Sequence, residues 1–106
     1  MVTTVIAVEA KGYHAQSAYL DKLVEELTHR GLEAWLMAPP ERVPSVYVVN
    51  PAARALEENV YVCLGEDGLW WFWWSWAERI SIADDLDAAA TAIIRVLSLP
   101  NALAAS

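Results

Sequence analysis

Residues 69–76 read Leu-Trp-Trp-Phe-Trp-Trp-Ser-Trp, and this run restricts the fold more than any other segment of the chain. In an extended strand, successive side chains point to opposite sides of the sheet. The run therefore presents large aromatic rings on both sides, whereas a strand with one face in water normally alternates apolar and polar residues. We expect a strand whose second face is either buried as well or used for binding.

A β-hairpin is predicted around this strand. Residues 60–64 form an apolar partner strand, and the Asp-Gly pair at 67–68 is a strong hairpin signal. We place Leu64 opposite Leu69, across a four-residue loop. One face, which we expect to be the core, then carries Val60, Val62, Leu64, Leu69, Trp71 and Trp73. The other face carries Tyr61, Cys63, Trp70, Phe72, Trp74 and Trp76.

The second of these faces is the candidate functional surface. Each large aromatic side chain can bury about 150–250 Å², so four of them exceed the few hundred Å² that monomers usually expose as one patch. We expect a protein partner, a second copy of the chain or a small ligand to cover them. The alternative is that the rings fill a shallow core beneath the N-terminal segment. The predicted binding residues are Tyr61, Trp70, Phe72, Trp74, Trp76, Glu78 and Arg79.

Two charged residues of this set follow the aromatic strand directly. Arg79 has the charge and the planar shape needed to stack on a tryptophan ring as a cation–π pair. Glu78 lies at the end of the strand, where it can contact a bound partner. Both residues are also common in ordinary turns, which is the competing interpretation.

Helices are predicted near both ends of the chain. In residues 17–30, four apolar side chains recur at helical spacing and form one stripe: Leu20, Leu23, Val24 and Leu27. Gly31 is suited to end that helix in a left-handed conformation. A second helix is expected over residues 84–99. Three aspartates crowd its N-terminus, where the helix dipole favours negative charge, and Pro100 stops it.

Two further strands are expected at residues 32–37 and 46–49, separated by a proline-containing loop. Residues 52–58 should form either one or two helical turns or a compact loop. The first fifteen residues are expected to be an extra strand or a flexible leader, and residues 100–106 a frayed tail. The sum is one α+β domain over residues 1–106. Its two layers are a mostly antiparallel sheet of three to five strands and two helices on one face.

The charge of the chain excludes some classes of partner. Its 106 residues include 14 acidic and 7 basic side chains, which gives a formal net charge of −7. Duplex nucleic acid and anionic membranes are unfavourable partners because they require clustered lysines and arginines. A basic partner fits the sign of the charge. No apolar run approaches the roughly 20 residues of a membrane span, and the N-terminus does not resemble a signal peptide, so we expect a cytoplasmic protein.

Residues with reactive side chains are few and scattered. Cys63 is the only cysteine, which leaves no internal disulfide and no cysteine zinc site. His29 suits the C-terminal end of a helix, and nothing in the sequence gives His14 a nucleophile or a metal partner. The three aspartates near residue 84 are explained by helix capping. We therefore predict no catalytic residue, no metal site, no cofactor and no enzymatic activity.

The segment from Asp67 to Ile80, followed by Ala83-Asp84-Asp85, resembles a small tryptophan-rich actinobacterial protein family. The resemblance spans about residues 17–99, and it implies a bacterial domain without an assigned activity. Our leading prediction is a non-enzymatic interaction module. Such an accessory or regulatory protein binds a protein partner, or itself as a homodimer, through an aromatic sheet face. The alternative is a small-ligand binding protein with a tryptophan-lined pocket.

Overall fold

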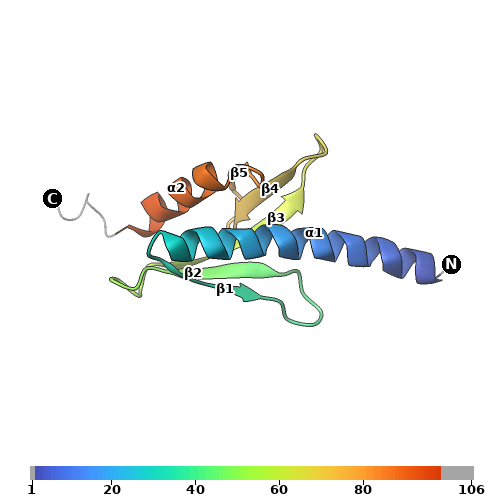
Figure 1. Ribbon diagram of the computed structural model, residues 1–106, viewed down its shortest axis with the longest axis horizontal. Helices are drawn as coiled ribbons and strands as arrows, with labels where there is room; N and C mark the ends of the chain where they lie inside the picture. The colour runs from blue at the N-terminus through green and yellow to red at the C-terminus, as the bar shows by residue number, and fades with distance from the viewer. Residues whose placement is uncertain (1, 99–106) are drawn as a thin grey trace.

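A computed structural model of the protein describes residues 2–98, with side chains described from residue 15 onward (Figure 1). The elements, in chain order, are α1 (Val2–His29), β1 (Glu33–Met37), β2 (Ser45–Val49), β3 (Glu57–Leu64), β4 (Trp70–Trp74), β5 (Arg79–Ile82) and α2 (Leu86–Leu97). The strands form one antiparallel sheet in the order β1-β2-β3-β4-β5. Each strand therefore pairs with its neighbour in the sequence.

Both helices lie on one face of this sheet, which we call the covered face. The apolar stripe of α1 is fully buried at Leu20, Leu23 and Leu27, and Ile93 is buried on α2. These side chains form one core with the sheet residues Val46, Val48, Val60, Val62, Phe72 and Trp74. The α+β, two-layer prediction is thus confirmed, because each helix has one apolar stripe and each stripe needs the sheet to cover it.

The first helix is longer than the sequence predicted. It starts at Val2, so the extra strand expected within the first fifteen residues is wrong for residues 2–15. Val2–Val8 is rich in β-branched residues, which favour strands only weakly and in context. Here the segment extends past the sheet, where no strand is available to pair with it (Figure 1). Continuing an existing helix needs no new nucleation. The predicted tail at 100–106 lies outside the described residues.

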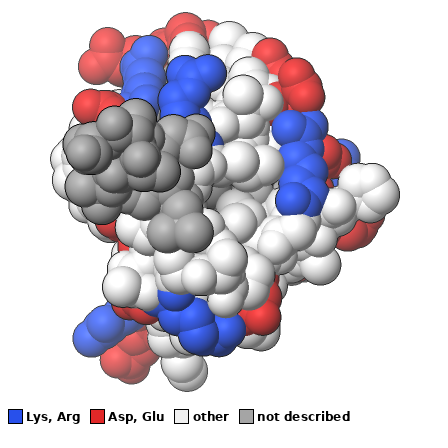
Figure 2. Space-filling view, turned by 90° about the vertical axis from the view of Figure 1, so that its left-hand side faces the viewer, with Lys and Arg blue, Asp and Glu red and all other residues white. Residues whose placement is uncertain are grey.

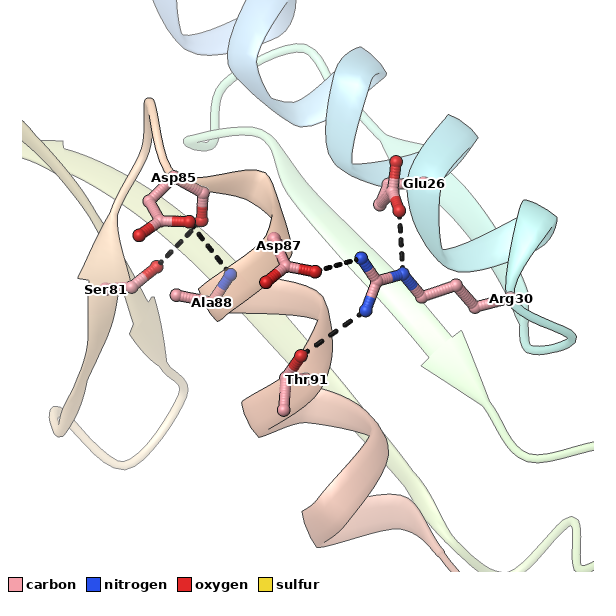
Figure 3. A network of polar contacts seen from close by, with 7 residues as sticks. All are labelled: Glu26, Arg30, Ser81, Asp85, Asp87, Ala88 and Thr91. Carbon is pink, nitrogen blue, oxygen red and sulfur yellow. Dashed lines mark hydrogen bonds and ion pairs between the residues drawn. The ribbon is translucent and has the colours of Figure 1, made fainter.

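The C-terminal end of α1 is fixed to α2 by Arg30 (Figure 3). Its Nε donates to Glu26 at 2.7 Å, and its Nη2 donates to Asp87 at 2.7 Å. Nη1 also donates to the Thr91 hydroxyl at 3.3 Å. These contacts raise the pKa of Arg30, chiefly through the Asp87 and Glu26 hydrogen bonds. Gly31 follows with φ +101°, which confirms the predicted left-handed end of this helix.

The predicted capping of the second helix is also confirmed, with a shorter helix than expected. Asp85 is the N-cap, and its Oδ1 accepts from the Ala88 backbone N–H at 3.0 Å. Within the predicted segment 52–58, residues 52–56 take the compact-loop alternative rather than the helical one, whereas Glu57 and Glu58 already belong to β3. There the Asn50 Oδ1 accepts from the Ala52 N–H at 2.9 Å, and Asn50 Nδ2 donates to the Leu97 carbonyl at 2.7 Å.

The β3–β4 hairpin differs from the predicted one by a single residue of register. Leu64 lies opposite Trp70, not opposite Leu69. Gly68 has φ +82°, and its N–H donates to the Gly65 carbonyl at 3.0 Å. The Gly65 N–H in turn donates to the Leu69 carbonyl at 2.7 Å. This is a three-residue loop with a left-handed glycine, which moves the pairing by one position relative to a four-residue loop.

That one-residue difference exchanges the two faces of β4. Trp70, Phe72 and Trp74 pair with Leu64, Val62 and Val60, and they point to the covered face. Trp71 and Trp73 point to the opposite side, with Tyr61 and Cys63. The sequence-based assignment of Trp71 and Trp73 to the core, and of the other rings to the binding surface, is therefore wrong.

Strand β5 was not predicted. The chain turns sharply after β4, where the Trp74 N–H donates to the Glu78 carbonyl at 2.8 Å and Ala77 adopts φ +66°. A register irregularity between Phe72 and Trp73 then places Arg79 opposite Trp73. Non-glycine residues rarely adopt such a positive φ, so the turn carried no recognisable signal in the sequence.

Candidate functional site

The side of the sheet that faces away from both helices, called the open face below, holds the candidate site. Within residues 2–98, no helix or strand packs on it. The strand register places five aromatic side chains on it: Trp35, Tyr47, Tyr61, Trp71 and Trp73. They come from four adjacent strands, so the rings spread across the sheet rather than along one strand.

On the β1 side of the open face, Trp35 and Tyr47 lie opposite each other in the register and stack. Their ring centroids are 5.8 Å apart at an interplanar angle of 23°. Trp35 remains 45% exposed. The Tyr47 hydroxyl donates to the Glu57 carboxylate at 2.5 Å, and this hydrogen bond raises the pKa of Tyr47. The stack therefore leaves part of the Trp35 side chain accessible on the open face.

On the β5 side of the open face, the Arg79 guanidinium contacts the rings of Trp71 and Trp73. Its guanidinium carbon lies 4.4 Å from the Trp71 ring centroid and 5.3 Å from that of Trp73. The predicted cation–π contact of Arg79 is thus confirmed, although its rings are the two that had been assigned to the core. The Trp73 indole nitrogen is buried and has no hydrogen-bond acceptor among the described residues.

The loop between β3 and β4 also restrains the Trp71 side chain, through Asp67 and Gly65. Asp67 Oδ2 accepts from the Trp71 indole N–H at 3.1 Å, and Oδ1 accepts from the Leu69 backbone N–H at 3.0 Å. The Leu69 bond is the main reason that the pKa of Asp67 is lowered, and the Trp71 bond and the Arg79 charge add to it. A Cβ on Gly65 would lie 2.9 Å from Trp71 Cδ1, so only glycine lets the ring approach this closely.

A hollow of about 520 Å³ lies beside the middle of the open face, under the loop that joins β1 and β2. Its lining residues are Met37, Pro39, Arg42, Val43, Ser45, Asn59 and Tyr61. Arg42 takes part in none of the ion pairs between described side chains. The hollow therefore combines an apolar wall, three neutral hydrogen-bonding groups and one cation.

The predicted binding residues do not all lie on one face of the sheet. Phe72 is 0% exposed and Trp74 is 4% exposed, so both belong to the core and not to a binding surface. Trp70 is partly buried against the same core, next to Tyr19. Trp76 is 47% exposed, but it stacks on Trp74 at 4.7 Å and lies on the covered side.

Three predicted residues remain to be placed. Tyr61 and Arg79 lie on the open face, as described above. Glu78 lies in the exposed turn between β4 and β5. The aromatic residues that the sequence analysis missed on this face are Trp35, Tyr47, Trp71 and Trp73. In residues 32–37, Glu33, Trp35 and Met37 alternate with Leu32, Ala34 and Leu36, and this pattern alone could have located Trp35.

The reactive side chains give no sign of a catalytic arrangement. Cys63 is exposed at the end of β3, and partial desolvation raises the pKa of its thiol, which disfavours the reactive thiolate. His29 ends α1 in an exposed position, and the side chain of His14 is outside the described set. Among the described residues, no three His, Cys, Asp or Glu side chains are grouped to hold a metal ion.

Charges of both signs are mixed on the part of the surface that Figure 2 shows. At the end where α1 finishes, each group of Lys or Arg side chains lies next to Asp or Glu (Figure 2). No continuous basic surface is visible there. None of the helices in the described part of the chain has the length and apolar character needed to cross a membrane.

Comparisons with protein-family models, with curated proteins and with solved structures find no match to this chain.

Proposed function

We propose that this chain is a non-enzymatic interaction module, an accessory or regulatory protein of the bacterial cytoplasm that binds a protein through its open face. The observation that carries the proposal is the set of five aromatic side chains on one face that no described element covers. Trp35 is 45% exposed and the other four rings are partly exposed, and apolar surface rimmed by polar residues is typical of protein interaction sites.

The composition of the open face supports a protein partner. Tryptophan, tyrosine, methionine and arginine are the residues enriched at protein interfaces, and Trp, Tyr and Arg dominate binding energy there. The open face combines Trp35, Tyr47 and Met37 on one side with Trp71, Trp73 and Arg79 on the other. Two of its rings are already held in place, by Asp67 and by Arg79, so little side-chain entropy is lost when a partner docks.

Single-stranded nucleic acid fits the same face poorly. Bases do stack on exposed aromatic rings, but such sites also need a positively charged groove along the phosphate backbone. The chain has a formal net charge of −7, and Arg54, one of the few cations near this face, is paired with Glu33 at 3.0 Å.

Photo-crosslinking in the cells that express the chain natively tests the proposal. A p-benzoylphenylalanine residue at position 61 replaces Tyr61 on the open face with a reactive ring of similar shape. The matched control carries the same residue in place of Trp76, an exposed ring on the covered side. We expect protein adducts from position 61 and few or none from position 76. Adducts from position 76 alone, or from neither position, would contradict the proposal.

The hollow beside β2 favours a second candidate function, the binding of a small organic anion. Its volume of about 520 Å³ is in the range of small-molecule sites, and Arg42 supplies the positive charge. It is not the tryptophan-lined pocket that the sequence predicted, because no tryptophan lines it. A panel of small carboxylates that raises the melting temperature of wild type but not of Arg42→Ala would support this function.

A further inference from the structure

We propose that the occupant of the open face is a second copy of this chain, packed face to face about a two-fold axis that lies parallel to the sheets and perpendicular to the strands. Trp35 of each copy enters the hollow of the other, and Arg42 faces the partner's Glu57, so this dimer and a small anion in the same hollow exclude each other. The inference rests on the proposed function, since it names the protein that the open face binds.

The open face carries both a projecting ring and a hollow, and such an axis can bring the two together. Trp35 lies in the middle of β1 and is 45% exposed, while the hollow begins at Met37 and Ser45, toward the β1–β2 loop. A two-fold axis perpendicular to the strands exchanges the two ends of every strand. When the axis crosses β1 near Leu36, it brings the Trp35 ring of one copy over the Met37 end of the other. An isologous interface requires this kind of self-complementarity.

Two oppositely charged residues at the two ends of the open face support the same orientation of the copies. Arg42 lies in the loop at one end of β1 and β2, and it has no carboxylate partner among the described side chains. Glu57 starts β3 at the opposite end of the sheet and accepts only the neutral Tyr47 hydroxyl. The same two-fold axis that seats Trp35 places each Arg42 near the partner's Glu57. The two pairs neutralise charges that are unpaired in a single copy.

The distribution of the remaining acidic residues favours this orientation. Six carboxylates lie on the helical side of the domain: Asp21, Glu25, Glu26, Asp84, Asp85 and Asp87. Packing the open faces together puts both helical layers on the outside, separated by two sheets about 10 Å apart. The two acidic helical layers are therefore more than about 10 Å apart, beyond the Debye length of about 8 Å at physiological salt, so the repulsion between them is largely screened.

The flat area of the open face is close to what a specific dimer needs. Five strands about 4.8 Å apart, with lengths of about 13–26 Å, give on the order of 430 Å² of flat face per copy. Two copies then bury about 860 Å² of flat face, and the side chains that project from it add contact area toward the roughly 1,000 Å² of a specific interface.

Sedimentation equilibrium over a wide range of protein concentration tests the dimer directly. We expect the wild-type chain to sediment with twice the mass of the monomer. Arg42→Glu and Glu57→Arg each place like charges together and should raise the dimer dissociation constant at least about tenfold. The double variant R42E/E57R restores opposite charges and should return to within about threefold of wild type.

The aromatic contact has its own matched pair of variants. Trp35→Ala should weaken the dimer at least about tenfold, as expected for a buried interface tryptophan. Trp76→Ala removes an equally exposed ring from the covered side and should leave the dissociation constant unchanged. Circular dichroism and urea unfolding of every variant separate loss of the dimer from loss of the fold.

A wild-type chain that stays monomeric, or a folded R42E/E57R variant that associates no better than its single parents, would overturn the dimer. The proposed function fails separately. If the chain is monomeric but position 61 still crosslinks to a different protein, the open face binds proteins and the partner is not a second copy. If the chain is monomeric and position 61 gives no adduct, both proposals are wrong.

Discussion

The two faces of strand β4 carry the same kinds of side chain in opposite surroundings. On the covered face, Phe72 and Trp74 are buried in the core, and Trp74 also stacks on Trp76. On the open face, Trp71 and Trp73 are held by Arg79, and Trp71 also by Asp67. Packing fixes one pair of rings and polar contacts fix the other. Aromatic composition alone therefore does not identify the core face of such a strand.

The largest expected difference between the faces is in stability. Phe72→Ala leaves a cavity in a fully buried site and should lower the free energy of unfolding by about 3–5 kcal/mol. Trp71→Ala, one residue away, should cost about 1–2 kcal/mol because its ring lies partly in water. Urea unfolding followed by circular dichroism measures both losses without relying on tryptophan fluorescence. Equal losses in the two variants would mean that the open face is packed as tightly as the core.

A smaller effect is expected from the cation that holds the open-face rings. Arg79→Ala removes both cation–π contacts and should lower the free energy of unfolding by about 0.5–1 kcal/mol. The freed indoles should also become more accessible to acrylamide quenching. Lys22→Ala is the control, since it removes one positive charge from the exposed surface of α1. If quenching rises equally in both variants, Arg79 does not hold the rings.

The smallest expected effect is a change in folding stability with pH, through Asp67. The pKa of Asp67 is lowered in the folded protein, so its carboxylate stabilises the fold fully above the unfolded value of about 3.9. That stabilisation is lost as the pH falls through the lower, folded pKa. The stability difference between wild type and Asp67→Asn should therefore narrow on acidification below pH about 4. A difference that stays constant across this range would show that Asp67 does not couple to folding.

Much of the fold follows from local patterns in the chain. The helical stripe from Leu20 to Leu27, the cap at Asp85, the proline loop after β1 and the Asp-Gly hairpin each specify one element through nearby residues. One apolar stripe per helix also requires both helices to cover the same sheet. The existence of β4 as a strand, and the presence of one covered and one open face, could therefore be predicted.

Which rings belong to which face depended on long-range pairing. A single left-handed glycine, Gly68, moves the register of β4 by one residue, and with a side-chain period of two this reverses both faces. The conformations of β5 and of residues 2–15 also depended on tertiary context. Residues 79–82 form a strand because they pair with β4. Residues 2–15 continue α1 because no described strand lies beside them. The sequence specifies that one aromatic face is left over. Only the tertiary pairing of β3 with β4 determines that this face is made of Trp35, Tyr47, Tyr61, Trp71 and Trp73.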